Sequence, residues 1–527
     1  MTDDAFFAHA AVAAPHSLAA EAGRDILLQG GNAIEAMVAT AASIAVAYPH
    51  MNAIGGDGFW IIREPRGKVR AIEACGFAGQ KATIAAYEAI GGLPTRGPKA
   101  ALTVPGAIGG WKIALELAAA LGGRLPLGDL MARAISQARE GVPISASEQR
   151  SQPRDGLALY DVPNFRAAYF QDDAPPKAGA LRKQGKLGET LAQLVHAGLD
   201  DFYRGDIARE IAADLDAAGS PVTRTDLKAY EARWREPLSI KTRDATLYNT
   251  PVPTQGLASL MILGIYELLG VRDVDSVEHA HALIETTKRV FAHRDRACVD
   301  FEVATADFDF LLSPAAFAAE AARIDMSRAA PWPLAPEQGD TIWMGAIDKD
   351  GLAVSYIQSL YWEYGSGLNL PRTGVLMQNR GIAFSLDPAS PRALKPGRRP
   401  FHTLNPALAV FPDGRVMPYG AMGGDGQPQF QAQVFTRIAA GQSLAKAVAA
   451  PRLLWGRTWG ADSVTVKVEA AYDDALAAGL ARRGHEVERM PAHRQDSFGH
   501  AGALRRALNG AIEATHDPRS DGGAFGV

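Results

Sequence analysis

Residues 339–348 read Gly-Asp-Thr-Ile-Trp-Met-Gly-Ala-Ile-Asp, and the composition of the chain changes just before them. The approach, residues 331–338, is proline-rich and polar, whereas Thr341 begins a run of β-branched and apolar residues that predicts a strand. Residues 348–351, Asp-Lys-Asp-Gly, predict a hairpin turn, and residues 352–359 predict its partner strand. This hairpin marks the start of a strand-rich final third.

The regions on either side of this boundary differ in their predicted elements. Before it the pattern is mostly helical, with expected helices at 17–29, 33–47, 111–121, 190–196, 208–217, 259–268 and 277–300 and strands at 59–62 and 69–74. After it we expect a second hairpin at 406–411 and 415–419, a strand at 464–468, and helices at 429–438, 444–449 and 473–483. Ser17 and Asn32 are the expected N-caps of the first two helices, and 148–190 is the most loop-like segment. Helices followed by strand hairpins predict an α+β protein with helices layered on antiparallel sheet.

The bulk composition is that of an ordinary globular chain with an ample core. Its 527 residues are 47% hydrophobic and carry a formal net charge of −4, which gives no electrostatic footprint for nucleic acid or an anionic membrane. Residues 1–7 lack a basic region followed by an apolar core, and no apolar run has the length of a membrane span. Cys75 and Cys298 form no redox or metal pair, so no disulfide is expected and the cytoplasm is the expected compartment.

Familiar catalytic and cofactor motifs are absent from the sequence. It contains no HExxH, GxxxxGK[ST], CxxC or GxSxG pattern. His279, His281 and His293 share one predicted helix, but spacings of two and twelve do not bring ligands side by side, so neither a metal nor a cofactor is expected. The glycine loop at 54–59 precedes a strand rather than opening a helix, which favours a turn or a pocket wall over a phosphate cradle.

Thr341 acquires a possible chemistry if the chain is cut before it. A hydroxyl is a poor nucleophile without a base nearby, and a free α-amino group on the same residue supplies one with a pKa of about 7.7–8.0. Attack of the Thr341 hydroxyl on the carbonyl of Asp340 would release that amino group. The residues alone do not single Thr341 out, because a threonine that opens a strand is usually only a strand former.

Ordered motifs over most of the chain provide stronger evidence. They are Pro15–Gly23 with Gly30–Ala33, Gly55–Phe59, Phe202–Gly205, Thr225–Tyr230, Glu285–Arg296, Asp348–Gly351, Tyr364–Gly367, Arg399–Pro400, Met422–Gly424 and Asp517–Gly522. On these motifs the chain resembles the γ-glutamyltransferase family of N-terminal-nucleophile hydrolases from about residue 10 to its C-terminus. The resemblance implies a four-layer αββα sandwich.

The same resemblance implies self-processing between Asp340 and Thr341. It makes residues 1–340 a large, helix-rich subunit and residues 341–527 a small subunit that begins at the nucleophile, the two intertwined in one fold. A homo-oligomer or a heterodimer of these fragments stays open. The expected partner is a small-molecule amide, with no nucleic acid and no membrane.

The resemblance also assigns catalytic roles to individual residues. It aligns Thr341 with the nucleophile and Gly423 and Gly424 with the paired N–H donors of an oxyanion hole, where one donor typically contributes about 2.7–4 kcal/mol. Ser359 aligns with the hydroxyl residue beside the nucleophile. A plain turn at Gly423-Gly424 and a neutral strand serine at 359 are the alternatives.

The residues that would read a glutamyl group differ from the family pattern. Cys75 stands where an arginine grips the α-carboxylate, and Ala383 where an acidic residue holds the α-amino group. Tyr361 replaces an asparagine, and His402-Thr403 replaces a serine pair. An α-amino acid headgroup would be poorly paired here, which argues against glutathione.

Arg380 is the cation that remains beside these positions, and it suits a substrate carboxylate by bidentate pairing. A surface salt bridge is the alternative for Arg380, and a structural role is the alternative for His402. The motifs at 339–345, 401–406 and 424–429 resemble the oxamate amidohydrolase branch of the family. Oxamate is a primary amide with an adjacent carboxylate and no amino group.

The expected function is therefore that of a self-processing threonine amidohydrolase acting on a small carboxylate-bearing amide through an acyl-enzyme. Alternatives are a γ-glutamyltransferase or γ-glutamyl hydrolase with a rebuilt pocket, an acylase for larger acyl amides, and a non-catalytic binding homologue.

Overall fold

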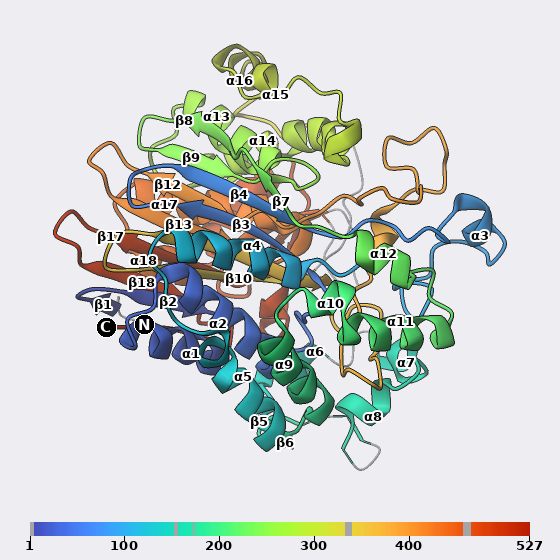
Figure 1. Cartoon of the computed structure of the whole chain (residues 1–527). Coiled ribbons are helices and arrows are strands. Elements are labelled where there is room, and N and C mark those ends of the chain that lie inside the picture. Colours follow the sequence, from blue (N-terminus) through green and yellow to red (C-terminus); the bar gives the residue numbers. More distant parts are fainter. Residues whose placement is uncertain (1–4, 152–155, 172–173, 176, 332–339, 457–464) are drawn as a thin grey trace.

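Two seven-stranded antiparallel sheets form the centre of the computed structural model, which describes residues 5–151, 156–171, 174–175, 177–331, 340–456 and 465–527 (Figure 1). Sheet I has the order β19 (Gly523–Gly526), β2 (Ala11–Ala14), β10 (Asp340–Ile347), β11 (Ala353–Tyr361), β3 (Asp57–Arg63), β4 (Val69–Ala74) and β7 (Arg233–Arg235). Sheet II has the order β1 (Ala5–Phe7), β18 (Ile512–His516), β17 (Ala501–Arg506), β13 (Val416–Ala421), β12 (Ala407–Val410), β9 (Thr246–Asn249) and β8 (Leu238–Lys241). Smaller sheets join β14 (Leu453–Trp455), β15 (Val466–Val468) and β16 (Val487–Arg489), and β5 (Val142–Pro143) with β6 (Leu181–Arg182).

The inner faces of the two sheets pack against each other around Trp343. A buried cluster joins Trp343 and Phe59 of sheet I to Leu504 of sheet II. A Cβ atom on Gly420 would lie 2.1 Å from the Trp343 ring, so only glycine leaves room for the indole at this position. The indole N–H donates to Ser355 Oγ at 2.9 Å, which satisfies its one polar atom.

Helices cover both outer faces. Outside sheet I lie α1 (Ser17–Leu28), α2 (Ala33–Ala47), α4 (Ala107–Ala120), α5 (Leu127–Glu140), α9 (Gly185–Ala197) and α11 (Asp206–Ala218). Outside sheet II lie α13 (Gly256–Leu268), α14 (Val277–Ala297), α16 (Pro314–Ala321), α17 (Gln427–Ala439), α18 (Leu444–Ala449) and α19 (Asp474–Arg482). The short helices are α3 (Ile84–Glu88), α6 (Ala146–Ser151), α7 (Gly156–Tyr160), α8 (Phe165–Tyr169), α10 (Asp201–Arg204), α12 (Arg224–Ala229) and α15 (Phe308–Leu311). The four layers confirm the predicted αββα sandwich.

Each sheet contains strands from both sides of residue 340, hydrogen-bonded to one another. In sheet I, β10 pairs with β2 on one edge and with β11 on the other. In sheet II, β12 pairs with β9, and β1 pairs with β18. The two ends of the chain also lie side by side (Figure 1), where the His9 N–H donates to the Val527 carbonyl at 2.8 Å.

The structure corrects several sequence predictions. His16 rather than Ser17 caps α1, because the His16 ring accepts the Leu18 N–H at 3.3 Å. Helix α4 begins at Ala107, four residues before the predicted start at Trp111. The 148–190 segment contains helices as well as loops. Strands β7, β8 and β9 interrupt a region expected to be mostly helical, and they were missed because strands of three or four residues carry little periodic signal. The Pro-rich stretch 332–338 and the predicted strand residue Val464 lie outside the described residues.

No helix in the described part of the chain is long and apolar enough to cross a membrane.

Candidate active site

Thr341 lies at an irregularity of the central strand pair of sheet I. Asp340 pairs with Tyr361 and Ile342 with Gln358, so two residues of β11, Ser359 and Leu360, lie opposite Thr341 alone. Such bulges re-aim side chains and are frequent beside active sites. The Thr341 hydroxyl donates to Ser359 Oγ at 3.1 Å, and the whole residue is buried in the uncut chain. The predicted nucleophile and its predicted hydroxyl neighbour are therefore in contact.

Tyr361 connects this pair to Arg380. The Tyr361 backbone has φ 86°, which a residue with a side chain rarely adopts, and its N–H donates to Ser359 Oγ at 2.8 Å. The Arg380 guanidinium carbon lies 3.6 Å from the centre of the Tyr361 ring, a close cation–π stack. Arg380 also donates to the Thr403 hydroxyl at 3.2 Å. Arg380 is buried rather than on the surface, so the surface salt bridge considered for it is wrong.

Asp57 at the start of β3 extends the polar cluster. The preceding Gly56 brings the loop against β11, since a Cβ atom there would lie 2.1 Å from the Ser359 carbonyl oxygen. Asp57 Oδ1 accepts the N–H groups of Gly76 at 3.0 Å and Gly106 at 3.1 Å. Burial raises the pKa of Asp57 to about 7, although these two hydrogen bonds and the charge of Arg380 favour its ionised form. The glycine loop therefore packs closely against β11 and holds a buried carboxyl group beside Ser359.

His402 faces Asp57 across a short gap. Its Nε2 atom lies 3.5 Å from Asp57 Oδ2, longer than a hydrogen bond, and its ring packs edge-on against Phe59 with centroids 5.0 Å apart. Burial, followed by the charge of Arg380, holds the pKa of His402 well below its usual range, so the imidazole is neutral. Within the described residues neither ring nitrogen has a hydrogen-bond partner.

Cys75 lies in the apolar layer between the sheets rather than in a polar pocket. It follows β4 and is fully buried with Phe59 and Trp343. Burial raises the pKa of its thiol well above the ordinary value, so the group is a neutral thiol with no reactive thiolate character. The neighbouring Gly76 N–H, not the cysteine itself, binds Asp57.

Gly423 and Gly424 follow β13 and lead into α17 through the short 3-10 turn Gly424–Gly426. Their φ values of 120° and 53° both lie in the left-handed region that favours glycine. The Gln255 side-chain amide donates to the carbonyls of Gly424 and Thr403, each at 2.8 Å. Gln255 thus ties the glycine turn to the loop that carries the Arg380 partner.

An ion pair between Arg294 and Asp425, which lies within the glycine turn, holds the Gln255 side chain in place. Arg294 donates to Gln255 Oε1 at 3.2 Å and to Asp425 Oδ1 at 2.8 Å, and all three side chains are buried. Neither Asp57 nor Gln255 was among the predicted site residues. Asp57 could have been found from its place inside the glycine loop, whereas no local pattern marks Gln255, whose role depends on residues far away in the chain.

The contacts thus bring most of the predicted site residues into one cluster. They run from Thr341 through Ser359, Tyr361, Arg380, Thr403 and Gln255 to Gly424. The cluster contains hydroxyl groups, a buried cation and a glycine turn, which are the parts that acyl transfer to a hydroxyl uses.

Comparison with known proteins gives the class. Residues 19–527 match the model of the gamma-glutamyltranspeptidase family. The chain is 48% identical over 520 residues to the oxamate amidohydrolase proenzyme of Klebsiella pneumoniae, covering 98% of each chain, and 35% identical to the glutathione hydrolase-like YwrD proenzyme of Bacillus subtilis, also over 98% of each. A crystal structure of cephalosporin acylase from Bacillus halodurans superposes with a TM-score of 0.91 at 32% identity, over 100% of this chain and 97% of that one.

These similarities and the αββα sandwich define an N-terminal-nucleophile hydrolase, an enzyme that hydrolyses amide bonds. Within that class, the chain belongs to the gamma-glutamyltranspeptidase family.

Proposed function

We propose that the chain cuts itself between Asp340 and Thr341 and then hydrolyses a small amide that carries a carboxylate, of the oxamate type. The observation that carries the proposal is the contact of the Thr341 hydroxyl with Ser359 at 3.1 Å, two residues before Tyr361, whose ring stacks on Arg380. The similarity to an oxamate amidohydrolase proenzyme supports both parts.

Burial of Thr341 in the uncut chain fits a proenzyme. A fully buried hydroxyl is out of reach of a dissolved substrate, whereas the carbonyl of Asp340 is covalently next to it. Attack on that carbonyl exchanges the amide for an ester, which water hydrolyses, and the freed amino group then serves as the base. In turnover the Thr341 hydroxyl attacks the substrate amide carbon, Gly423 and Gly424 N–H groups hold the oxyanion, ammonia leaves, and water resolves the acyl ester.

Arg380 is the residue that we assign to the substrate carboxylate. Two of its partners, the Thr403 hydroxyl and the Phe401 carbonyl, are neutral oxygens, and Tyr361 fixes the plane of its guanidinium. A planar, fixed guanidinium suits bidentate pairing with a carboxylate. Cys75 and Ala383 are buried among apolar side chains and offer no charged group to the α-amino acid headgroup of a glutamyl substrate. The product of oxamate hydrolysis would be oxalate.

The test combines a denaturing gel with an assay of ammonia release. In proportion to the 55.9 kDa chain, residues 1–340 and 341–527 give fragments of about 36 and about 20 kDa, and Thr341→Ala should leave one full-length band and no activity. Thr246→Ala, a strand threonine of sheet II, is the matched control and should be cut normally. Wild-type protein that stays uncut yet hydrolyses amides would contradict the proposed mechanism.

An acylase for larger acyl amides is the second candidate, favoured by the fold similarity to cephalosporin acylase over nearly the whole of both chains. A glutathione-type hydrolase is the third, suggested by the relatives of that name. Ammonia release from oxamate, compared with release from glutamine and with cleavage of a γ-glutamyl anilide and of a bulky acyl amide, separates the three.

A further inference from the structure

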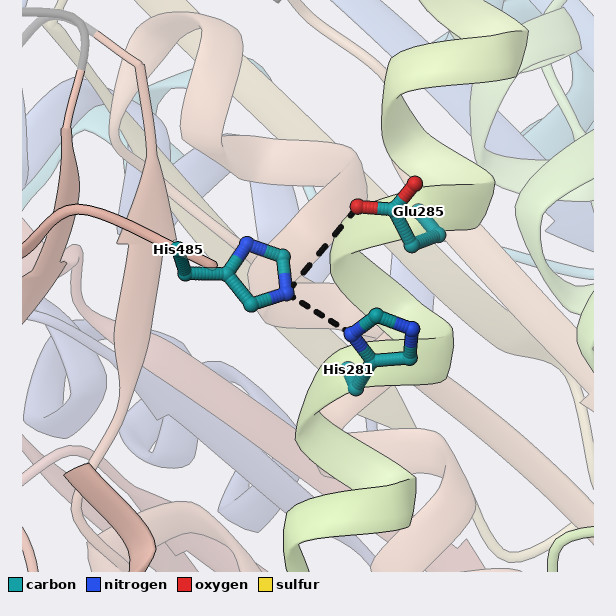
Figure 2. Close-up of side chains that lie close together, drawn as sticks. All are labelled: His281, Glu285 and His485. Carbon is teal, nitrogen blue, oxygen red and sulfur yellow. Dashed lines mark hydrogen bonds and ion pairs between the residues drawn. The ribbon is translucent and has the colours of Figure 1, made fainter. Parts of the chain in front are cut away.

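Two histidines and a glutamate converge on the outer side of sheet II, away from the Thr341 cluster. His281 and Glu285 lie one turn apart on α14, and His485 approaches them from the segment that follows α19 (Figure 2). His281 Nδ1 and His485 Nε2 are 2.7 Å apart, and His485 Nε2 is 3.9 Å from Glu285 Oε1. The three side chains are buried, and one ligand atom from each lies within 4.8 Å of the others.

We propose that His281, Glu285 and His485 form a binding site for a divalent transition-metal ion of the Zn²⁺ class. Two imidazole nitrogens and one carboxylate oxygen are a ligand set that Zn²⁺ uses in proteins, with a water as the fourth ligand. An i, i+4 pair on one helix together with a ligand from a separate segment gives three converging donors. The spacing of His279, His281 and His293 did not predict this site, because its other ligands are Glu285 and the distant His485.

The surroundings orient the His281 ligand as metal sites require. His281 Nε2 lies 2.9 Å from the Asp325 carbonyl oxygen, which can only accept, so the proton sits on Nε2 and the Nδ1 lone pair points into the cluster. Metal-bound histidines usually donate their other N–H to a carbonyl or carboxylate in this way. Burial also holds the pKa of both histidines below the usual value, in agreement with neutral rings.

Glu285 is oriented by the chain just before residue 331. Its Oε2 accepts the Ala330 N–H at 3.0 Å, which turns Oε1 toward the histidines. Oε1 also accepts from Lys288 Nζ at 2.6 Å. The lysine charge opposes a divalent ion at this distance, so we expect a moderate affinity that rises when the charge is removed.

The metal-free cluster has a competing arrangement. A proton on His485 Nε2 can bridge to His281 Nδ1 at 2.7 Å and satisfy both atoms. Two nitrogens bound tetrahedrally to Zn²⁺ at about 2.0–2.1 Å lie roughly 3.3 Å apart, so metal binding requires the rings to separate by about 0.6 Å. A hydrogen-bonded pair that never exchanges its proton for a metal is the alternative that the experiment must exclude.

The site has a structural consequence that rests on the proposed self-cleavage. His281, Glu285, Asp325 and Ala330 precede the cut and His485 follows it, so a bound ion would join the two fragments near the end of the first. Metal binding itself does not depend on the cut, and measuring it in uncut Thr341→Ala protein separates failure of this inference from failure of the proposed function.

The experiment uses tag-free full-length protein, stripped with EDTA, loaded with Zn²⁺, desalted and analysed for bound metal by mass spectrometry. We expect about one ion per chain, and a loss of affinity of at least about tenfold in His281→Asn and in His485→Asn. His293→Asn, on the same helix but outside the cluster, is the matched control and should bind like wild type. Lys288→Met should bind more tightly than wild type.

Loading with Co²⁺ provides a measurement that does not depend on a variant folding. Visible d–d bands of a tetrahedral nitrogen- and oxygen-ligated ion are expected in wild type. Absence of these bands, or zinc retained equally by His281→Asn, His485→Asn and wild type, would overturn the proposal. An unfolding temperature that rises with Zn²⁺ in wild type but not in His485→Asn would support it.

Discussion

Asp57 and Asp517 are both buried aspartates, yet their surroundings shift their pKa values in opposite directions. Asp57 lies beside the Thr341 cluster, where burial raises its pKa to about 7 and Oδ2 has no hydrogen-bond partner among the described residues. Asp517 follows β18, where both oxygens accept from arginines: Arg452 donates to Oδ2 at 2.6 Å and Arg519 to Oδ1 at 3.0 Å. Although burial alone would raise it, the net effect of these two charges holds the pKa of Asp517 well below its usual range.

The difference distinguishes a structural framework, the paired charges around Asp517, from the candidate site around Asp57 and Thr341. Around Asp517 the buried charges are paired with one another, as stability requires. Around Asp57 and His402, buried polar atoms are left with hydrogen-bonding capacity that the protein does not use, which is what a site for a polar ligand provides. Substitutions in the first region should therefore affect folding, and substitutions in the second should affect catalysis and its pH dependence.

The largest effect is expected from Asp517→Asn. It leaves Arg452 and Arg519 buried with one anionic partner fewer, and should lower the free energy of unfolding by about 3–5 kcal/mol at pH 7. Because the native pKa of Asp517 is depressed, its contribution is present above the unfolded pKa of about 3.8 and is lost as pH falls below it. Urea denaturation at pH 7 and at lower pH measures both the loss of unfolding free energy and its pH dependence. Asp474→Asn is the control: Asp474 also pairs with an arginine, but its side chain is 96% exposed, so little change is expected. Equal losses in the two variants would contradict the framework role.

Arg380→Gln tests the pocket side of the comparison. Loss of the guanidinium should lower kcat/KM for oxamate by about 10²–10³-fold, or about 3–4 kcal/mol, because the substrate carboxylate loses its partner in a buried site. The unfolding free energy should change much less than in Asp517→Asn. Arg398→Gln, a half-buried arginine outside the cluster, is the control and should keep full activity. A variant that loses activity equally on an amide without a carboxylate would refute carboxylate recognition by Arg380.

Asp57→Asn should change how stability depends on pH. A raised carboxyl pKa means that the native state keeps a proton that the unfolded chain releases, so this group lowers stability as pH rises from about 4 to about 7. The full pKa shift corresponds to about 4 kcal/mol of stability. We expect roughly half of this in the measured unfolding free energy, because an ionised Asp57 draws water into the site. The unfolding free energy of the variant minus that of wild type should therefore increase between pH 4.5 and pH 7.5. A difference that stays constant with pH would show that Asp57 is already ionised.

Ser359→Ala is expected to have the smallest effect. Its Oγ accepts from both the Thr341 hydroxyl and the Tyr361 N–H, and loss of one such contact typically costs about 1 kcal/mol. We expect self-cleavage and amide hydrolysis each to slow by roughly fivefold to tenfold. Ser355→Ala on the same strand removes the partner of the Trp343 N–H between the sheets and should reduce stability instead. If Ser359→Ala left both rates unchanged, Ser359 would only be a strand residue.

The sequence predicted those parts of the fold that carry strong local signals. Helix α2 from Ala33 to Ala47 and strand β4 from Val69 to Ala74 have the predicted bounds, since a capping asparagine and a regular apolar pattern mark them. The hairpin that begins at Thr341 and the layering of helices on antiparallel sheet were also predicted from local sequence patterns. The four-layer αββα arrangement was predicted only from the family resemblance. Short edge strands such as β8 were missed, because four half-exposed residues carry too little pattern.

The site could be predicted only where a motif identified a residue. Thr341 and Gly424 came from the family pattern. Gln255 and the Asp57–His402 approach could not be found, because they depend on residues that are distant in sequence and meet only when the sheets pack. The same reason hid His485, which reaches α14 from the other side of the proposed cut.

The pairing of strands from the two sides of residue 340 also determines when the proposed cut can occur. Strand β10 is hydrogen-bonded to β2, which precedes residue 340, and β12 is hydrogen-bonded to β9, which does too. While the chain is continuous, folding is a first-order reaction of one molecule. After the cut, refolding from denaturant requires two different polypeptides to meet, so it becomes second-order and slows on dilution. The proposed cut must therefore follow folding, and a cleaved protein would persist through the slowness of its unfolding rather than through its ability to refold.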